Sequence, residues 1–181
     1  MIRLPHPKVH LHLGGEKVQS GSGGIYAHIN AATGEIDAEI PLAGRDDVNR
    51  AVEAAAVAFE SWRRWKPTER RDVMLRLASL LEQNADRLCQ YTTMDNSIPV
   101  STTAVQGILA KNWIAYYAGF ADKIEGSVMS SYISDTDFGY THLEPYGVVG
   151  LIVTWNGPVP NLCMKAGAAL AAGNAIVVKT P

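Results

Sequence analysis

The stretch GVVGLIVTWNGPVPNLCMKAGAALAAGNAIVVK, residues 147–179, decides the fold of this chain. It opens with an uninterrupted apolar run, 148–153, of the kind typical of parallel strands that are covered on both faces. A helix is expected over about 158–172, because proline is favoured in the first turn of a helix. A second apolar run, 175–178, follows and ends at Lys179. Strand, helix and strand with short joints predict a right-handed βαβ crossover and a chain of the α/β class.

Two polar residues of this stretch follow the predicted strands, at the sheet edge where open α/β sheets bind ligands. Asn156 could serve as a helix N-cap, but with Pro158 as the first helical residue Gly157 takes that position. We therefore interpret Asn156 as a ligand-binding group in the loop. Lys179 by itself is more typical of a solvated strand end than of a functional site, and Trp155 could equally be a core anchor under the loop.

The motifs EPYGVVGLIVTWNGP and KAGAALAAGNAIVVK, at 144–158 and 165–179, resemble the entry to the cofactor domain of the aldehyde dehydrogenase superfamily. The resemblance extends along the whole chain in the order and spacing of that family. Its further motifs are INAATGE (29–35), PLAGRDDVNRAVEAA (41–55), MDN (94–96) and YYAGFADKIEG (116–126).

The resemblance implies NAD- or NADP-dependent oxidation of an aldehyde to a carboxylic acid, in which a cysteine thiolate attacks the carbonyl and a glutamate activates water. It implies that Asn156 donates a hydrogen bond to the oxyanion, as a preorganised donor. It also implies that Lys179 reaches a ribose hydroxyl of the cofactor and that Lys165 lies near the cofactor. The residues implied to line the dinucleotide are Ile152, Val153, Thr154 and Trp155.

Two departures from the family pattern stand out. Thr154 occupies a position where the family commonly has proline, which loosens the loop but keeps its backbone contacts. The family also continues well beyond Lys179, and its nucleophilic cysteine and glutamate base lie in that later part. The resemblance thus covers about the first two-fifths of a family member, and we expect the 181-residue chain to be inactive by itself.

The two cysteines, Cys89 and Cys163, are not expected to replace that nucleophile. Each lies in a predicted helix, where free cysteines are usually small buried hydrophobic residues. Nothing in the sequence around either one indicates a thiol of low pKa.

Composition excludes several other classes of function. The formal net charge of -2, with 19% charged residues, gives no indication of a nucleic-acid ligand, and no apolar run reaches the length of a membrane span. The N-terminus has no signal-peptide pattern, and two distant cysteines form no disulfide framework, so a cytoplasmic location is expected. His10 and His12 share a strand face but lack a third ligand, so no metal site is predicted.

Alternating and helical apolar patterns predict the remaining elements. Strands are expected over 9–13, 25–29 and 36–40, and helices from Arg45, from Pro67 and over 99–121, the last almost wholly buried. The residues expected on the buried sides of these helices are Val48, Ala51, Val52, Ala55 and Phe59; Met74, Leu77, Leu80, Leu81 and Leu88; and Ile108, Trp113, Tyr116 and Phe120.

A hairpin is expected where Tyr132-Ile133 and 138–142 flank Asp135-Thr136-Asp137. By resemblance this hairpin is the oligomerisation element, which implies a homodimer or homotetramer. The expected parts are the N-terminal strands and helices (1–126), the hairpin (127–144) and the first, incomplete βαβ unit of a Rossmann-like NAD(P)-binding domain (145–181).

A second hypothesis is a non-catalytic short product that pairs with a subunit or binds a partner. The last strand, 175–178, is continuously apolar, as an interior strand should be, and as an edge it would expose unpaired backbone groups. We therefore expect the sequence to have been shaped for a longer protein and the isolated chain to be poorly soluble. The identity of the aldehyde and the choice between NAD and NADP are left open by these residues.

Overall fold

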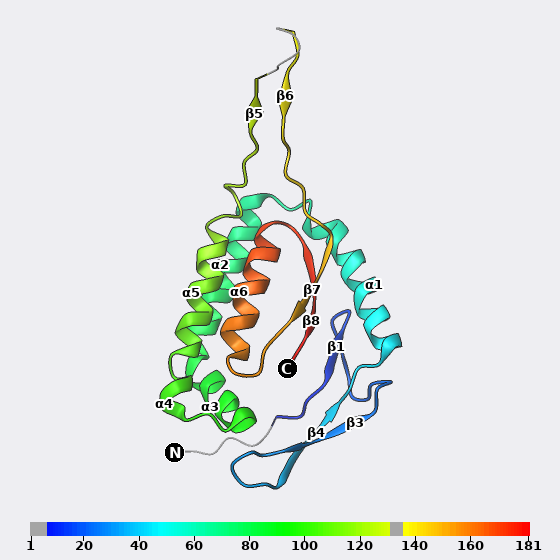
Figure 1. The fold of residues 1–181 in the computed structure, drawn as a ribbon, viewed down its shortest axis with the longest axis vertical. Helices are drawn as coiled ribbons and strands as arrows, with labels where there is room; N and C mark the ends of the chain where they lie inside the picture. The colour runs from blue at the N-terminus through cyan, green and yellow to red at the C-terminus, as the bar shows by residue number, and fades with distance from the viewer. Residues whose placement is uncertain (1–6, 131–135) are drawn as a thin grey trace.

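The computed structural model describes residues 7–130 and 136–181. Its centre combines packed helices with a parallel pair of strands that lies between α6 and α1 (Figure 1). These central elements are α1 (Arg45–Trp62), α2 (Pro67–Gln83), α5 (Gln106–Ala118), α6 (Pro158–Ala171), β7 (Val148–Ile152) and β8 (Ala175–Lys179). Around them lie β1 (Leu11–Leu13), β2 (Glu16–Val18), β3 (Ile25–Ile29), β4 (Ile36–Pro41), α3 (Ala85–Asn96), α4 (Val100–Thr103), β5 (Val128–Met129) and β6 (Gly139–Tyr140).

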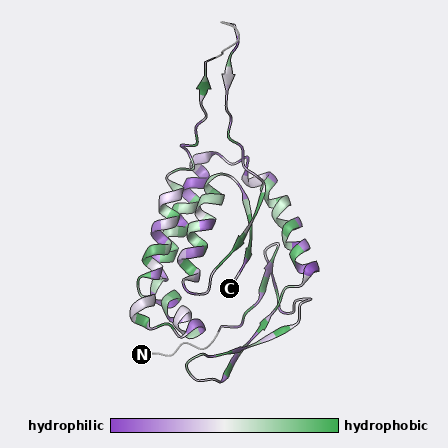
Figure 2. Ribbon diagram, viewed as in Figure 1, coloured by the Kyte–Doolittle hydropathy of each residue, from purple (hydrophilic) through white to green (hydrophobic). Residues whose placement is uncertain are grey.

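The βαβ unit lies where the sequence predicts it. β7 and β8 are parallel, with Val148 opposite Ala175 and Ile152 opposite Lys179, and both are hydrophobic along most of their length (Figure 2). The expectation that β7 is covered on both faces is wrong for Ile152, which is 71% exposed. Gly150, in the middle of β7, is exposed as well. Within the described residues β7 pairs with β8 alone, so one side of this narrow sheet edge is left open.

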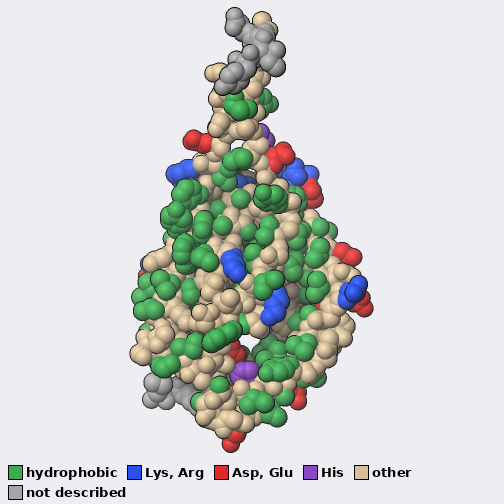
Figure 3. Space-filling model, in the orientation of Figure 1, with side chains coloured by type: hydrophobic (Ala, Val, Ile, Leu, Met, Phe, Trp, Pro, Cys, Tyr) green, Lys and Arg blue, Asp and Glu red, His purple; other side chains and the backbone are tan. Residues whose placement is uncertain are grey.

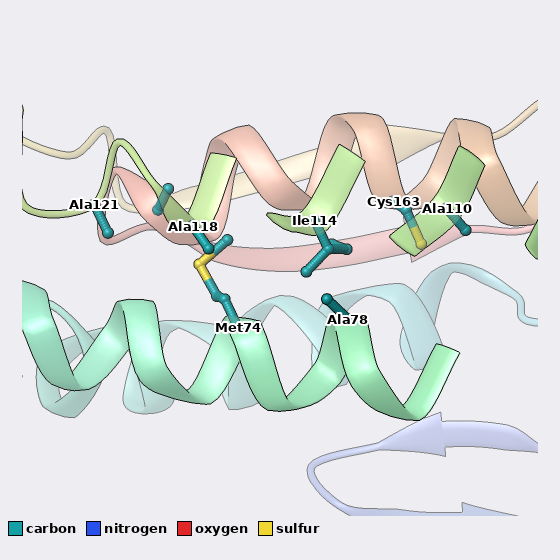
Figure 4. Packing of buried hydrophobic residues seen from close by; sticks show 8 residues of the cluster. Met74, Ala78, Ala110, Ile114, Ala118, Ala121 and Cys163 are labelled. Carbon is teal, nitrogen blue, oxygen red and sulfur yellow. The ribbon is translucent and has the colours of Figure 1, made fainter. Parts of the chain in front are cut away.

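The hydrophobic core lies among α2, α5 and α6 and consists mainly of small side chains. Ile114 of α5 is 1% exposed and points toward α2, whose Met74 is also 1% exposed (Figure 4). The other buried members are Ala78, Ala110, Ala118, Ala121, Cys163 and Ala171. Small residues let the helices approach closely: a Cβ on Gly107 would lie 2.6 Å from the Cβ of Ala85. No helix of the described residues is long and apolar enough to cross a membrane.

The prediction of one almost wholly buried helix over 99–121 is wrong. The chain forms α4 and α5 instead, and α5 buries the face that carries Ala110, Ile114 and Ala118. Ile108 and Tyr116 are each 57% exposed. The reason is that α5 contacts α2 and α6 along one side, while no described element covers its other side.

Other predicted buried residues also lie at the surface. Ala55 and Met74 are buried as expected, and the helix expected from Pro67 ends at Gln83, so that Leu88 belongs to α3. The expected core residues that are exposed instead are Val48, Val52, Leu77, Leu80 and Phe120. Apolar side chains are therefore spread over the visible face of the helical layer (Figure 3).

The N-terminal strands form two antiparallel hairpins, β1–β2 and β3–β4, as the alternating pattern predicts. Asp47, in the first turn of α1, ties the loop between these hairpins to the helix. Its Oδ2 accepts hydrogen bonds from the Ser22 backbone N–H (2.6 Å), the Ser22 hydroxyl (2.7 Å) and the Gly44 N–H (3.0 Å). These donors lower the pKa of the Asp47 carboxyl, the Ser22 hydroxyl having the largest effect.

The β5–β6 hairpin projects from the end of the helical layer opposite the N-terminal hairpins (Figure 1). It is antiparallel, with Val128 opposite Tyr140 and Met129 opposite Gly139. The predicted contributions of Tyr132, Ile133 and Asp135 lie outside the described residues. Among the described hairpin residues, Val128 is 71% and Phe138 is 72% exposed, so the hairpin offers apolar side chains to the surface.

α3 ends at a serine in the left-handed conformation: Ser97 has φ +54° and ψ 21°. That conformation costs a residue with a Cβ about 1–2 kcal/mol, and the Ser97 hydroxyl is buried without a hydrogen-bond partner among the described residues. We expect Ser97→Gly to raise the free energy of unfolding by about 0.5–1 kcal/mol, measured by urea denaturation, since the flexibility of glycine in the unfolded chain offsets part of the gain.

Ser101→Gly, at a helical position of α4, is the matched control. It should lower the free energy of unfolding, because glycine disfavours a helical backbone. Equal destabilisation by both changes would show that the backbone at Ser97 carries no such cost.

Candidate functional site

A hollow of about 390 Å³ opens at the carboxyl ends of β7 and β8. This is the edge where parallel α/β sheets bind ligands. The residues that line it are Val153, Thr154, Trp155, Asn156, Lys179 and Pro181. Asn156 and Lys179, the two polar residues that follow the predicted strands, therefore line one hollow.

The loop that carries Asn156 is held by the backbone on both sides. On the strand side, the Val153 N–H donates to the carbonyl of Lys179 at 3.0 Å, which extends the β7–β8 pairing by one residue. On the helix side Gly157 is the N-cap of α6, and its carbonyl accepts from the N–H of Asn161 at 3.0 Å. The Asn156 side chain is exposed and has no hydrogen-bond partner among the described residues, so its amide is available to a ligand.

Lys179 and Lys165 lie in different surroundings. Lys179 ends β8, is exposed, and has no ion pair among the described residues. Lys165 on α6 donates from its ammonium to the carbonyl of Ile152, the last residue of β7. Lys165 thus fixes the end of β7 and, like Ile152, does not line the hollow, whereas Lys179 does.

Trp155 is 65% exposed, which excludes the alternative that it anchors the core beneath the loop. The exposed Trp155 and Thr154 line the hollow beside Asn156, the first with an apolar indole and the second with a polar hydroxyl. Val153 is 6% exposed and contributes to the hollow from within the strand end.

Asn174, which the sequence reasoning missed, holds the opposite end of the same two strands. It is 4% exposed; its Oδ1 accepts from the Gly147 N–H at 3.0 Å, and its Nδ2 donates to the Ala169 carbonyl at 3.1 Å. These bonds join the start of β7, the end of α6 and the start of β8. Together with the bond from the Ala175 N–H to the Gly147 carbonyl at 2.9 Å, Asn174 supports the register in which Lys179 lies opposite Ile152. The available signal was a polar amide between a helix-ending glycine and an apolar strand.

Neither cysteine has the surroundings of a reactive thiolate. Burial raises the pKa of the Cys163 thiol to about 11. Cys89 is buried, with its sulfur 2.9 Å from the hydroxyl oxygen of Thr103. The interpretation of both as small buried residues is confirmed.

Within residues 7–130 and 136–181, no three His, Cys, Asp or Glu side chains are grouped so as to hold a metal ion. His12 is exposed, and His10 is half-buried.

The sequence model of the aldehyde dehydrogenase family matches residues 18–181. The chain belongs to the aldehyde dehydrogenase family. The match begins at the end of β2 and includes every residue of the hollow, so the resemblance found in the motifs is confirmed.

Relatives in the family share both sequence and fold with this chain. DhaS of Bacillus subtilis (strain 168), which is named as an aldehyde dehydrogenase, is 41% identical over 172 residues, covering 93% of this chain and 34% of DhaS. The crystal structure of PnpE in complex with nicotinamide adenine dinucleotide is 32% identical, with a TM-score of 0.89 over 95% of this chain and 35% of PnpE. An NADP-dependent enzyme of E. coli is 26% identical, with a TM-score of 0.90 over 95% of this chain and 36% of that enzyme.

The chain therefore spans about a third of the length of these aldehyde dehydrogenase relatives. Its α/β fold is that of the N-terminal portion of the family, with the strands and helices leading into a βαβ unit. The predicted fold class is confirmed.

Proposed function

We propose that this chain takes part in the NAD(P)-dependent oxidation of an aldehyde to a carboxylic acid. The observation that carries the proposal is the hollow at the carboxyl ends of β7 and β8. It is lined by the amide of Asn156 and the ammonium of Lys179, neither of which has a partner among the described residues. The family membership and the cofactors named for PnpE and the E. coli enzyme support it. The aldehyde itself is not specified by these residues.

Asn156 is the proposed catalytic residue of this chain. Attack of a thiolate on an aldehyde places negative charge on the carbonyl oxygen, and a side-chain N–H held in place stabilises that charge. The loop between β7 and α6 holds Asn156 from both ends, and its amide has no partner among the described residues that it would first have to leave.

The same hollow is the proposed dinucleotide site. Val153, Thr154 and Trp155 line the hollow, and Ile152 precedes them at the end of β7. The exposed Trp155 indole offers a flat apolar surface to the proposed cofactor. The Lys179 ammonium would donate to a ribose hydroxyl of the cofactor, while Lys165 holds the end of β7 through the Ile152 carbonyl. The bound nicotinamide would supply the acceptor for the hydride that leaves the aldehyde carbon.

The nucleophile and the general base are proposed to come from residues other than these 181. Cys163 holds its proton tightly because it is buried, and Cys89 is buried beside Thr103. The 181-residue chain by itself is accordingly proposed to be inactive and poorly soluble. The exposed apolar side chains of the β5–β6 hairpin support the proposal that the hairpin joins subunits of a homodimer or homotetramer. The proposed parts of the chain remain the N-terminal strands and helices (1–126), the hairpin (127–144) and the βαβ unit (145–181). The proposed location is the cytoplasm.

A non-catalytic product that pairs with another subunit is the second candidate function. It is favoured by the exposed Val128 and Phe138 of the hairpin and by the edge of β8, which pairs only with β7 among the described strands.

The intact mass of the native gene product, compared with 19.6 kDa for these residues, distinguishes the aldehyde-oxidising enzyme from the non-catalytic pairing product. It also shows which protein should be assayed. For a product of larger mass we expect aldehyde-dependent reduction of NAD or NADP, and none by the 181-residue chain assayed alongside it. Aldehyde oxidation by the 181-residue chain alone, abolished by Asn156→Ala, would contradict the proposed division of the active site. A product of about 19.6 kDa that oxidises no aldehyde would favour the pairing function.

A further inference from the structure

A histidine connects the β3–β4 hairpin to the end of α3. His28 of β3 has a side chain that is 12% exposed. Its Nδ1 lies 2.5 Å from Oδ1 of Asp37 on β4. Its Nε2 lies 3.1 Å from the backbone carbonyl oxygen of Asp95 in the last turn of α3, and 3.6 Å from the Oδ1 of the same residue.

The orientation of a neighbouring amide shows that Oδ2 of Asp37 accepts a hydrogen bond. Oδ1 of Asn30 accepts from the N–H of Ala32 at 2.9 Å and from the N–H of Thr33 at 3.2 Å, so its amide nitrogen must point the other way. That nitrogen donates to Oδ2 of Asp37 at 3.0 Å. Asp37 therefore faces Asn30 through Oδ2 and His28 through Oδ1.

Both ring nitrogens of His28 consequently face acceptors, a carboxylate on one side and a carbonyl on the other. A neutral imidazole can donate from only one nitrogen, whereas the imidazolium donates from both. The hydrogen bond to Asp37 raises the pKa of His28 above its ordinary value of 6.5, against the opposing effect of burial, and the Asp95 carbonyl adds to the rise.

Little apolar packing holds the turn end of the β3–β4 hairpin, where His28 lies. His28 is the one residue of β3 that is not exposed, and Ile29 beside it is 55% exposed. At its other end the hairpin is anchored through the Leu42 carbonyl, which accepts from Gly23 at 3.0 Å, and through the bonds of Asp47 to Ser22. The contacts of His28 with Asp95 thus join the turn end of the hairpin to the helical layer.

We propose that His28 is a proton-operated latch that holds the turn end of the β3–β4 hairpin against the C-terminal end of α3. With both ring nitrogens protonated, His28 donates to Asp37 and Asp95 together and the latch is closed. Loss of one proton leaves a nitrogen lone pair opposite an acceptor, and the hairpin end separates from α3. Among the described residues, the titratable groups that face the ring are Asp37 from β4 and Asp95 from α3.

The direction of the pH dependence follows from linkage. A group whose pKa is raised in the closed state stabilises that state. The stabilisation is complete below the pKa that the group has in the open state, here about 6.5, and it is lost as the pH rises through the pKa of the closed state. Between these two values opening releases one proton. The equilibrium constant for opening should therefore rise by up to about tenfold per pH unit, and be constant outside that interval.

Hydrogen exchange measured by mass spectrometry on the native gene product tests this. The exchange rate of the imidazole C2 proton against pH reports the protonation of His28, and amide exchange over 25–41, corrected for intrinsic rates, reports opening. We expect the His28 midpoint to lie above 6.5 and amide protection to fall over the same interval. A midpoint at or below 6.5, or protection that does not change with pH, would overturn the latch.

Two substitutions on β4 separate the latch from a general charge effect. Asp37→Asn should move the His28 midpoint to lower pH and remove the pH dependence of hairpin protection. Glu39→Gln, which removes the same charge from an exposed position two residues away on the strand, should leave both unchanged. An unchanged midpoint in Asp37→Asn, or an equal shift in Glu39→Gln, would count against the proposal, and the titration of the unsubstituted chain tests it without any variant.

Discussion

Asn156→Ala is expected to lower kcat for aldehyde oxidation by the native gene product by about 10²- to 10³-fold. Asn156 lies in the hollow at the carboxyl ends of β7 and β8, with an amide that no described residue engages. A donor that acts on charge developing in the transition state contributes to kcat more than to substrate binding, so KM for the aldehyde should change much less. Steady-state kinetics with saturating cofactor measures both.

Asn156→Asp and Asn49→Ala are the matched comparisons. Asn156→Asp keeps the size of the side chain but replaces the N–H donor by a negative charge, so it should be at least as damaging as alanine. Asn49→Ala removes an exposed amide from α1, far along the chain from the hollow, and should leave kcat unchanged. A rise in KM with kcat retained in Asn156→Ala would show that the amide binds the ground state and is not the oxyanion donor.

Ile114→Ala is expected to lower the free energy of unfolding by about 3 kcal/mol. Ile114 is 1% exposed and lies in the cluster formed by α2, α5 and α6, where its neighbours are mostly alanines that cannot expand into the space left behind (Figure 4). The loss combines the transfer free energy of the deleted atoms with the cost of the remaining cavity. Urea denaturation followed by far-UV circular dichroism gives the value.

Ile108→Ala deletes the same atoms from the same helix and serves as its control. Ile108 is 57% exposed, so its change should stay within about 0.5 kcal/mol. Equal losses at the two positions would mean that the exposed face of α5 is packed in solution, against the arrangement of helices described above.

The elements that the sequence predicts well are those specified by neighbouring residues. The β7–α6–β8 unit follows from two apolar runs separated by Pro158 and closed by Gly173, whose φ of +87° suits a glycine that ends a helix. The position of Asn156 outside the helix follows in the same way, because Gly157 and Pro158 fill the cap and the first turn. Local backbone preferences depend on a few neighbouring residues, so they can be predicted directly from the amino-acid sequence.

Burial could not be predicted in the same way. Ile108 and Ile114 are the same residue type on one helix, yet one is exposed and the other buried, because α2 and α6 contact only one side of α5. The helical period of the sequence did not distinguish these sides, since α5 is apolar all round apart from Lys111 and a few polar residues. Which side is covered depends on elements far away in the chain.

For this protein, the sequence alone determined the α/β class, the place of the βαβ unit, the family and the candidate residues Asn156 and Lys179. Packing between distant segments places those two residues in one hollow, bonds Asn174 to the start of β7, and brings His28 between Asp37 and Asp95. The physical reason is the range of the interactions. Secondary structure depends on residues that are neighbours in the chain. Burial and side-chain hydrogen-bond partners depend on packing between segments that are far apart in the chain, and the local sequence does not indicate which segments will meet.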